Sequence, residues 1–259
     1  MADNPYAAPR ARVEDQVTEL AGRFTDRART APAGRGWNWI SEGVAFFRRQ
    51  PLTWVLITLV LIALGIASAF VPVLGGLALQ VLTPALSAGL MLGCRRLEEG
   101  GELTVGALFS GFSVRGGRLV GLGALGLVAT VLVFALIGVV LGLGMWTLLG
   151  AQASPEMGPE GVLTILLGVL IAVALSIPIY MAMWFAPALI ALNDLSLGDA
   201  IRSSFGACLR NMLPFLVYGV VMLVFMVVAM IPIGLGLLVL LPVLFTSVYA
   251  SYRDLFFEP

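Results

Sequence analysis

Side chains that could carry chemistry are few in this chain. Histidine is absent from all 259 residues, which removes the commonest general base and the commonest metal ligand. The two cysteines, Cys94 and Cys208, have no accompanying ligand residues of the kind that complete a metal site. The sequence contains neither a hydrolase nucleophile elbow nor paired catalytic carboxylates. We therefore predict that the protein is not an enzyme and has no catalytic, metal or cofactor site.

Neutral polar residues are scattered through long apolar stretches that contain no Asp, Glu, Lys, Arg or His. They include Thr58, Ser68, Gln80, Ser87, Thr130, Ser176, Tyr180 and Ser247. Gln80 is the most polar of them and suits a hydrogen bond between two helices, with a contact to a bound molecule as the alternative. We take Gln80, Ser176 and Tyr180 as the candidate polar contacts within the apolar part of the protein.

The elements that must hold these residues are membrane-spanning helices. The chain is 59% hydrophobic and 12% charged, whereas soluble domains are about 25% charged. A helix needs about 20 residues to cross the hydrocarbon of a bilayer. Turns near Pro72 and Pro232 and a loop at 151–161 divide the apolar stretches, which predicts six spans at residues 52–71, 77–93, 119–142, 162–191, 213–231 and 235–252. The predicted fold class is an all-α, polytopic transmembrane helical bundle with its six spans in three hairpins.

The absence of ionisable residues at membrane depth also bears on function. Charged groups inside a bilayer are expensive and are kept for proton relays, ion sites and voltage sensing. Their absence counts against an ion-coupled transporter. The net charge of zero argues against a nucleic-acid partner, because few counterions would be released on binding.

The arginines predict the orientation of the spans. All fifteen basic residues are arginines, and the six-span threading places every one on the same side of the membrane. By the positive-inside rule that side is the cytoplasm, so both termini are predicted to be cytoplasmic and the two cysteines reduced. Arginines at the span ends are candidate contacts for lipid headgroups, including anionic ones. They are Arg48, Arg49, Arg95, Arg96, Arg210 and Arg253.

A short amphipathic helix is predicted on the inner surface ahead of each hairpin, at residues 36–50, 103–114 and 196–211. The predicted inward faces are Trp37, Ile40, Val44 and Phe47, then Val105, Leu108, Phe109 and Phe112, then Leu197, Ile201, Phe205 and Cys208. Similar triplets begin at Pro84, Pro187 and Pro242 in the even-numbered spans, which indicates an internal repeat. Chance similarity between apolar motifs is the alternative.

Small residues recur at spacings of four within the spans. The rows are Ala85, Gly89 and Gly93, then Gly138 and Gly142, then Gly168, Ala172 and Ser176. Such rows let helices approach closely in lipid, so we predict interfaces within the bundle, with self-association as the alternative.

The first 35 residues form a separate predicted region. They are polar, carry charges of both signs and lack the apolar core of a secretory signal. We expect residues 1–35 to be a largely disordered tail or a short amphipathic helix, with Val13, Val17, Leu20 and Phe24 on one face. Residues 36–259 then form the six-helix transmembrane domain.

One set of residues and short motifs extends through most of the chain, namely Trp39, Phe46-Phe47-Arg48, Pro51, Trp54, Pro84, Gly89, Pro187-Ala-Leu, Leu241-Pro-Val-Leu and Tyr249-Ala-Ser-Tyr-Arg-Asp. Together these residues resemble a family of uncharacterised six-span inner-membrane proteins of proteobacteria. The resemblance covers residues 36–257. That family is distantly similar to the membrane domain attached to some glycerophosphodiester phosphodiesterases. The resemblance implies a bacterial inner-membrane location and a helical bundle. No catalytic residue can be carried over, because this chain has no phosphodiesterase catalytic domain.

These observations predict an integral membrane protein with two candidate roles. The first is a non-catalytic envelope component that binds lipids or partner proteins. The alternative is a transporter or channel for a neutral or lipid-like solute, built on proline-kinked helices. A continuous polar or water-wide cavity near Gln80, Ser176 and Tyr180 would favour the second role, and a packed apolar interior would favour the first.

Overall fold

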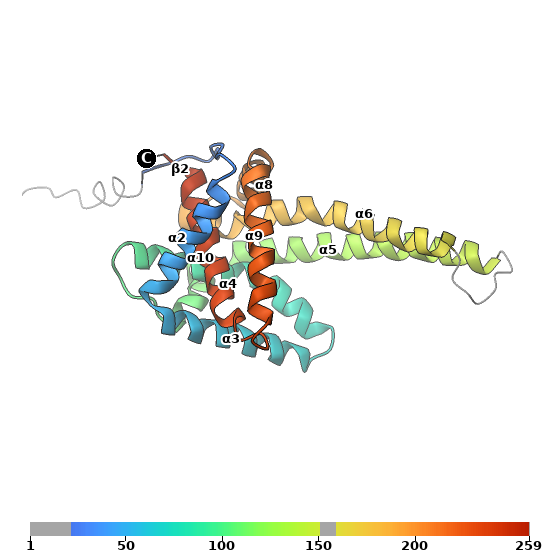
Figure 1. Ribbon diagram of the computed structural model, residues 1–259, viewed down its shortest axis with the longest axis horizontal. Coiled ribbons are helices and arrows are strands. Elements are labelled where there is room, and N and C mark those ends of the chain that lie inside the picture. Colours follow the sequence, from blue (N-terminus) through green and yellow to red (C-terminus); the bar gives the residue numbers. More distant parts are fainter. Residues whose placement is uncertain (1–21, 151–158, 259) are drawn as a thin grey trace, which may run out of the picture.

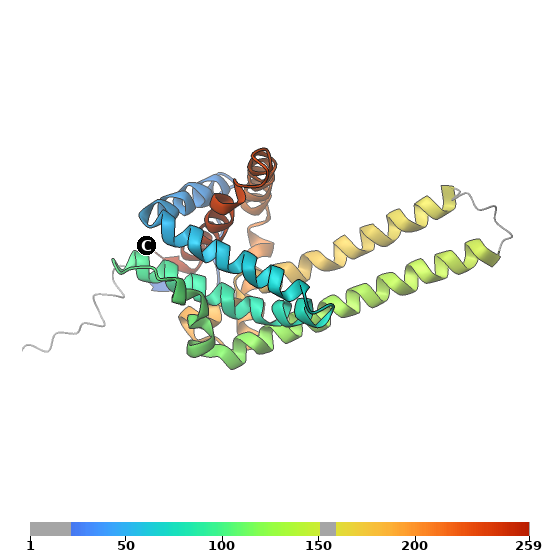
Figure 2. The same cartoon turned by 90° about the horizontal axis from the view of Figure 1, so that it is seen from below.

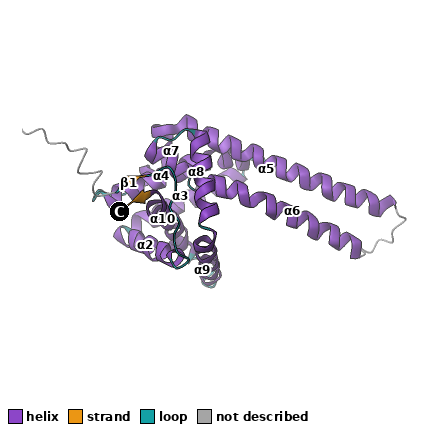
Figure 3. Cartoon of the chain, turned by 90° about the horizontal axis from the view of Figure 1, so that it is seen from above, coloured by secondary structure: helices purple, strands orange, loops and turns teal. Residues whose placement is uncertain are grey.

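A computed structural model describes residues 22–150 and 159–258, and nearly all of them are helical (Figures 1 and 3). The elements, in chain order, are β1 (Arg23–Phe24), α2 (Arg35–Arg49), α3 (Pro51–Ala69), α4 (Leu74–Glu98), the 3₁₀ helix η1 (Val105–Phe109), α5 (Ser110–Gly150), α6 (Pro159–Trp184), α7 (Ala186–Asn193), α8 (Leu197–Arg210), α9 (Met212–Met230), α10 (Leu237–Phe256) and β2 (Phe257–Glu258).

Six helical segments of the described residues are long and apolar enough to cross a membrane. They correspond to α3, α4, η1 with α5, α6 with α7, α9 and α10. The all-α, polytopic bundle predicted from the sequence is therefore confirmed. Short turns join α3 to α4 and α9 to α10, as the proline and glycine positions indicate.

The fourth predicted span is interrupted between α6 and α7 at Phe185. Pro187 lies in the first turn of α7, where it has no N–H to donate and its ring would clash with a carbonyl one turn earlier. The backbone N–H of Phe185 donates instead to the hydroxyl of Ser204 on α8, at 2.9 Å. The Ser204 hydroxyl in turn donates to the carbonyl of Met181, at 2.7 Å. The break is thus fixed against α8.

The hairpin of α5 and α6 extends well beyond the rest of the molecule (Figures 1 and 2). α5 has 41 residues, with a kink at Arg115, so at 1.5 Å per residue it is about 60 Å long. The hydrocarbon of a bilayer is about 30 Å thick. This hairpin therefore exceeds the membrane thickness unless it is strongly tilted. α9 and α10 run across the direction of α5 and α6 (Figure 1).

All three predicted amphipathic segments are helical, although the second is a 3₁₀ helix that continues into α5. The face predicted for the first is correct at Ile40, which is buried, and in part at Val44 and Phe47, which are partly buried against the core, but it is wrong at Trp37. In α2 the buried residues are Gly36, Trp39, Ile40, Gly43 and Phe46, whereas the side chain of Trp37 is 51% exposed. The glycines are the reason, because they let α2 lie directly against α9 and α10. A Cβ added at Gly36 would stand 2.3 Å from the carbonyl oxygen of Pro214.

In the third amphipathic segment, α8, the buried face also differs from the predicted one. Its buried face is Ala200, Ser204, Ala207 and Cys208. Of the predicted inward residues, Cys208 is buried, Leu197 and Ile201 are partly buried against the core, and Phe205 is exposed. Small residues make the close contact with the protein, so the large apolar residues stand at the edges of the helix. The second segment agrees better with its prediction through the fully buried Leu108, although Phe109 is 44% exposed.

The helix interfaces predicted from rows of small residues are present in some helices and absent in others. In α4 the row Ala85, Gly89 and Gly93 is buried, and a Cβ at Gly89 would meet the carbonyl oxygen of Leu108 at 2.2 Å. The interface predicted there is confirmed. Gly138 and Gly142 of α5 have no described atom near their Cβ positions. They are therefore not an interface within the bundle.

Residues 22–34 are held against the C-terminal end of the chain. β1 pairs with β2 in an antiparallel arrangement, with Phe24 opposite Phe257. The backbone N–H groups of Thr25 and Arg29 donate to carbonyls at the end of α10. This part of the predicted tail therefore packs on the transmembrane domain, and we call it the strap. Phe24 is in a strand rather than a helix, and Val13, Val17 and Leu20 lie outside the described residues.

Candidate functional site

A groove lies between α4, α5 and α6, within the membrane-spanning segments. Its volume is about 450 Å³. The lining residues are Gln80, Thr83 and Pro84 from α4, then Gly123, Gly126, Thr130, Val133, Phe134 and Ile137 from α5, and Ala172, Ser176, Ile179, Tyr180 and Met183 from α6. The structure thus brings together the three polar residues singled out in the sequence. None of the described lining residues is charged.

Two glycines of α5, Gly123 and Gly126, line the groove where neighbouring helices come close. A Cβ at Gly123 would stand 2.0 Å from the carbonyl oxygen of Val81, so α5 lies directly against α4 at this level. A Cβ at Gly126 would meet the end of the Met183 side chain at 2.9 Å. Side chains larger than glycine on this face of α5 would push the helices apart or fill the groove.

The polar groups of the groove are hydrogen bonded in a definite order. The side-chain amide nitrogen of Gln80 donates to the hydroxyl of Thr130, at 3.0 Å. The Thr130 hydroxyl donates to the carbonyl of Gly126, at 2.9 Å. The hydroxyl of Ser176 donates to the carbonyl of Ala172, at 2.7 Å. Gln80 therefore joins α4 to α5, as the helix-packing interpretation of this residue expects.

Tyr180 differs from the other polar groups of the groove. Its side chain is 69% exposed, and its hydroxyl has no hydrogen bond to any described residue. The carbonyl oxygen of the Gln80 side chain likewise accepts no hydrogen bond from the described part of the chain. Both groups remain available to a molecule in the groove.

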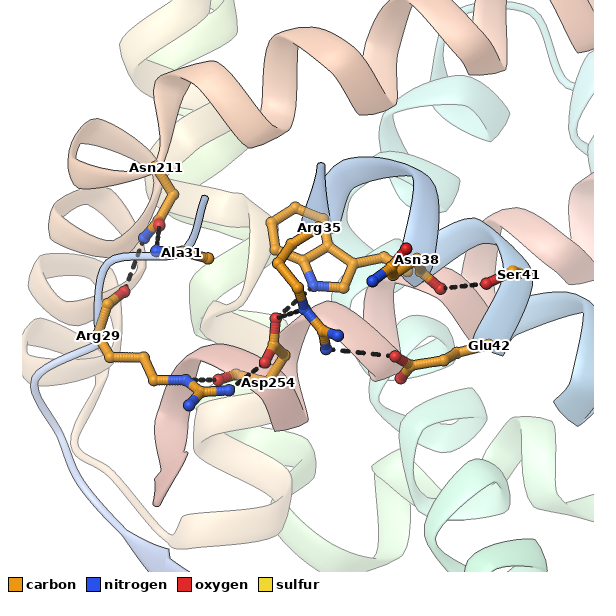
Figure 4. Close-up of polar contacts among 9 residues, drawn as sticks. Arg29, Ala31, Arg35, Asn38, Ser41, Glu42, Asn211 and Asp254 are labelled. Atoms are coloured by element: carbon orange, nitrogen blue, oxygen red, sulfur yellow. Dashed lines mark hydrogen bonds and ion pairs between the residues drawn. The ribbon is translucent and has the colours of Figure 1, made fainter. Parts of the chain in front are cut away.

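A second polar site, centred on Asp254, was not predicted from the sequence. The Asp254 side chain is only 3% exposed. One carboxylate oxygen accepts from Arg35 Nε at 2.7 Å and from Trp39 Nε1 at 2.8 Å, and the other accepts from Arg29 (Figure 4). A carboxylate placed one residue after the last arginine of the final span was the signal available in the sequence.

Asn211 and Glu42 complete this site from two sides. Asn211 accepts from the backbone N–H of Ala31 at 2.8 Å and donates to the carbonyl of Arg29 at 3.0 Å (Figure 4). Glu42 pairs with Arg35 at 3.2 Å, and partial burial raises the pKa of its carboxyl above the ordinary value. Every carboxylate oxygen of Asp254 already has a protein donor. The arrangement therefore fastens the strap to α10, and it leaves no open position for a substrate.

Five of the six candidate lipid-contact arginines lie where α2, α4 and α10 end. Arg49 donates to the carbonyl of Leu97 at 2.8 Å, and Arg253 pairs with Glu98, which connects the three helix ends. Arg95 pairs at 2.9 Å with Glu99, which follows the last residue of the same helix.

Arg48 and Arg96 are exposed at the same end and have no hydrogen bond or ion pair to any described residue. Arg210 lies apart from this group and donates to the carbonyl of Ala28 in the strap, at 3.2 Å. The structure therefore leaves two of the six arginines with fully available guanidinium groups.

Both cysteines are free and buried. Cys94 is fully buried in α4. Burial raises the pKa of the Cys208 thiol to about 12, which makes it a poor nucleophile. Among the described residues no group of three or more Cys, Asp or Glu side chains is placed to hold a metal ion.

One further ion-pair site lies at the start of α5 and the end of α7, where the α5–α6 hairpin joins the rest of the molecule. Asp194, which follows α7, accepts from Arg115 and from Arg118, each at 2.6 Å. The hydrogen bond from the Arg115 guanidinium lowers the pKa of Asp194 below its ordinary value. These residues hold the two ends of the hairpin together at the predicted membrane surface.

Comparison with known proteins agrees with this architecture. A probable inner membrane protein of Burkholderia thailandensis is 30% identical over 249 residues, which cover 86% of this chain and 92% of the relative. The chain belongs to this family of inner-membrane proteins. Together with its six apolar helices, this makes it a multi-pass protein of the inner membrane. No family model and no solved structure matches it. The similarity to the membrane domain of glycerophosphodiester phosphodiesterases stays a prediction.

Proposed function

We propose that this inner-membrane protein is a non-catalytic lipid-binding protein that holds a neutral, lipid-like molecule in the groove between α4, α5 and α6. The observation that carries the proposal is the groove itself. Its volume of about 450 Å³ is typical of sites for small molecules. It is lined by Gln80, Ser176 and Tyr180, whereas a purely structural bundle would be packed at this position.

The position and chemistry of the groove favour a lipid-like occupant. The lining consists mainly of apolar side chains, and it belongs to helices that are themselves apolar enough to face lipid. A molecule in the bilayer could therefore enter from the side without crossing water. An ion would find no compensating charge among the described lining residues, and burying it uncompensated would be costly.

The groove can be tested by filling it. Ala172 lines the groove, while its neighbour Val173 is 52% exposed on another face of α6. We expect Ala172→Phe to abolish the neutral lipid that the purified protein retains, measured by mass spectrometry of lipid extracts. Val173→Phe adds the same side chain outside the groove and should retain the wild-type amount. Equal lipid content in the two variants, or no neutral lipid on the wild-type protein, would contradict the proposal.

We further propose that the arginine-rich end faces the cytoplasm and that both termini lie there. The distribution of all fifteen arginines supports this orientation. A reporter fused after Glu258 should be active only as a cytoplasmic reporter, and one inserted between residues 154 and 158 only as a periplasmic reporter. The reverse pattern would overturn the orientation.

Anionic lipid at the arginine-rich end is a second proposed interaction. It is supported by Arg48 and Arg96, which have no partner in the described part of the chain. Replacing both with glutamine should reduce retained anionic lipid without affecting neutral lipid. The exposed Arg202 of α8 provides the control, because its replacement leaves the converging helix ends intact. An unchanged anionic lipid content in the double variant would reject this interaction.

A further inference from the structure

The orientation of the Gln80 amide determines what the groove can offer to a ligand. The Thr130 hydroxyl has a single proton, and it donates that proton to the carbonyl of Gly126. Thr130 can therefore only accept from Gln80, so the amide nitrogen of Gln80 must face Thr130. The carbonyl oxygen of Gln80 is left without a donor from the described residues. A ligand that satisfies it must carry an O–H or N–H group.

The other two polar groups of the groove, Ser176 and Tyr180, differ in the hydrogen bonds that they can offer to a ligand. The Ser176 hydroxyl uses its proton on the carbonyl of Ala172, so it can offer only lone pairs to a ligand. The Tyr180 hydroxyl has no partner in the described part of the chain and can both donate and accept. The groove as a whole therefore presents more acceptors than donors. A ketone or a simple ester, which only accepts, would leave the Gln80 oxygen unsatisfied.

The lack of charged residues in the groove further restricts which headgroup a ligand can have. No arginine, aspartate or glutamate is among the described residues that line the groove. A fatty-acid carboxylate or a phosphate buried there would have no counter-ion, and an uncompensated charge in an apolar site is strongly disfavoured. The head of the ligand must therefore be neutral while still donating a hydrogen bond. A hydroxyl group meets both conditions.

We infer that the groove recognises a neutral lipid with a free hydroxyl head, of the acylglycerol class, through the side chains of Gln80 and Tyr180. The hydroxyl donates to the carbonyl oxygen of Gln80 and accepts from Tyr180. The start of the acyl chain lies against the apolar residues of α5, and the rest of the chain continues along the lipid-exposed helices. This inference rests on the proposed lipid-binding function and adds to it the chemistry of the headgroup.

The test compares three probes with the same acyl chain, bound to the whole protein in nanodiscs and measured by native mass spectrometry. Monooleoylglycerol has a neutral head with hydroxyls, methyl oleate has no donor, and oleate is charged. We expect monooleoylglycerol to bind at least about fivefold more tightly than methyl oleate, as one satisfied hydrogen bond implies. Oleate should bind more weakly than monooleoylglycerol.

Variants separate recognition from folding. Gln80→Leu should reduce the preference for monooleoylglycerol over methyl oleate to nearly one, while methyl oleate binding is retained. A loss of folding would instead lower the binding of every probe together. Tyr180→Phe should lower the preference by a smaller factor, because the ligand hydroxyl can still donate to Gln80.

The outcomes distinguish this inference from the function on which it rests. If methyl oleate or oleate binds the wild-type protein as tightly as monooleoylglycerol, and Ala172→Phe still abolishes that binding, the headgroup assignment is wrong and the lipid-binding function stands. The headgroup assignment is also wrong if Gln80→Leu keeps the full preference. If no probe binds the wild-type protein, the proposed function fails and the headgroup assignment fails with it.

Discussion

Replacing Asp254 with asparagine is the sharpest test of how the strap is held. The carboxylate accepts three side-chain hydrogen bonds, from Arg29, Arg35 and Trp39. Asparagine has nearly the same shape but only one acceptor oxygen and no charge. Its NH₂ group would point toward at least one donor. Asp254→Asn therefore changes the hydrogen bonding of the site with little change in packing.

The expected loss of stability depends on how exposed each hydrogen-bond partner of Asp254 is. A hydrogen bond to a charged group contributes about 1.5–3 kcal/mol. The side chains of Arg29 and Arg35 are 47% and 29% exposed, so water can replace part of what they lose. Trp39 is completely buried, and its indole N–H has no alternative partner among the described residues. We expect a loss of about 2–4 kcal/mol in the free energy of unfolding.

The assay is unfolding in mixed detergent micelles by titration with sodium dodecyl sulfate, followed by tryptophan fluorescence. Glu99→Gln is the matched control, because it removes a carboxylate from an exposed pair with Arg95, one turn earlier in the chain. Such pairs contribute about 0.3–0.5 kcal/mol. If Asp254→Asn costs no more than Glu99→Gln, the structural role given to Asp254 is refuted.

Three further predictions concern packing, thiol reactivity and pH. Gly43→Ala should lower the unfolding midpoint, because its Cβ would stand 2.8 Å from the backbone of α10. Gly65→Ala is the control, because its Cβ meets no described atom, and it should not lower the midpoint. Cys94 and Cys208 should resist maleimide in the folded protein and react after denaturation, and labelling of either one without unfolding would contradict their burial. Asp194→Asn should remove stability that is present above the pKa of about 3.9 of an unfolded aspartate and is lost as pH falls through the lowered folded pKa. The midpoint difference between wild type and Asp194→Asn should therefore shrink on acidification, and a constant difference would contradict the assignment.

The groove shows how far single residues can be interpreted before their neighbours are known. Gln80, Ser176 and Tyr180 stood out in the sequence because polar groups are unusual in charge-free apolar stretches. Their convergence depends on three helices and on the close contact of α5 with α4 at Gly123. The direction of the Gln80 amide could not be known without Thr130, which lies on another helix.

The amphipathic helices show a different limit of prediction from the sequence. Periodicity located all three of them, but it ranked faces by the size of apolar side chains. In α2 the buried face contains two glycines beside Trp39, Ile40 and Phe46, and in α8 it consists of Ala200, Ser204, Ala207 and Cys208. Trp37 and Phe205 stand at exposed edges for that reason.

The sequence by itself determined the number of spans and the turns between them, and it predicts a common side for the arginines. These properties follow from the cost of placing charge in hydrocarbon and from the length of chain needed to cross it, which are local in the sequence. Only the tertiary structure decided that residues 22–34 pack on the end of α10, and that Asp254 is satisfied by donors more than two hundred residues away. It likewise decided which polar groups share one groove. Such contacts depend on how helices distant in sequence cross and on which small residues let them meet, and no local pattern in the chain specifies that geometry.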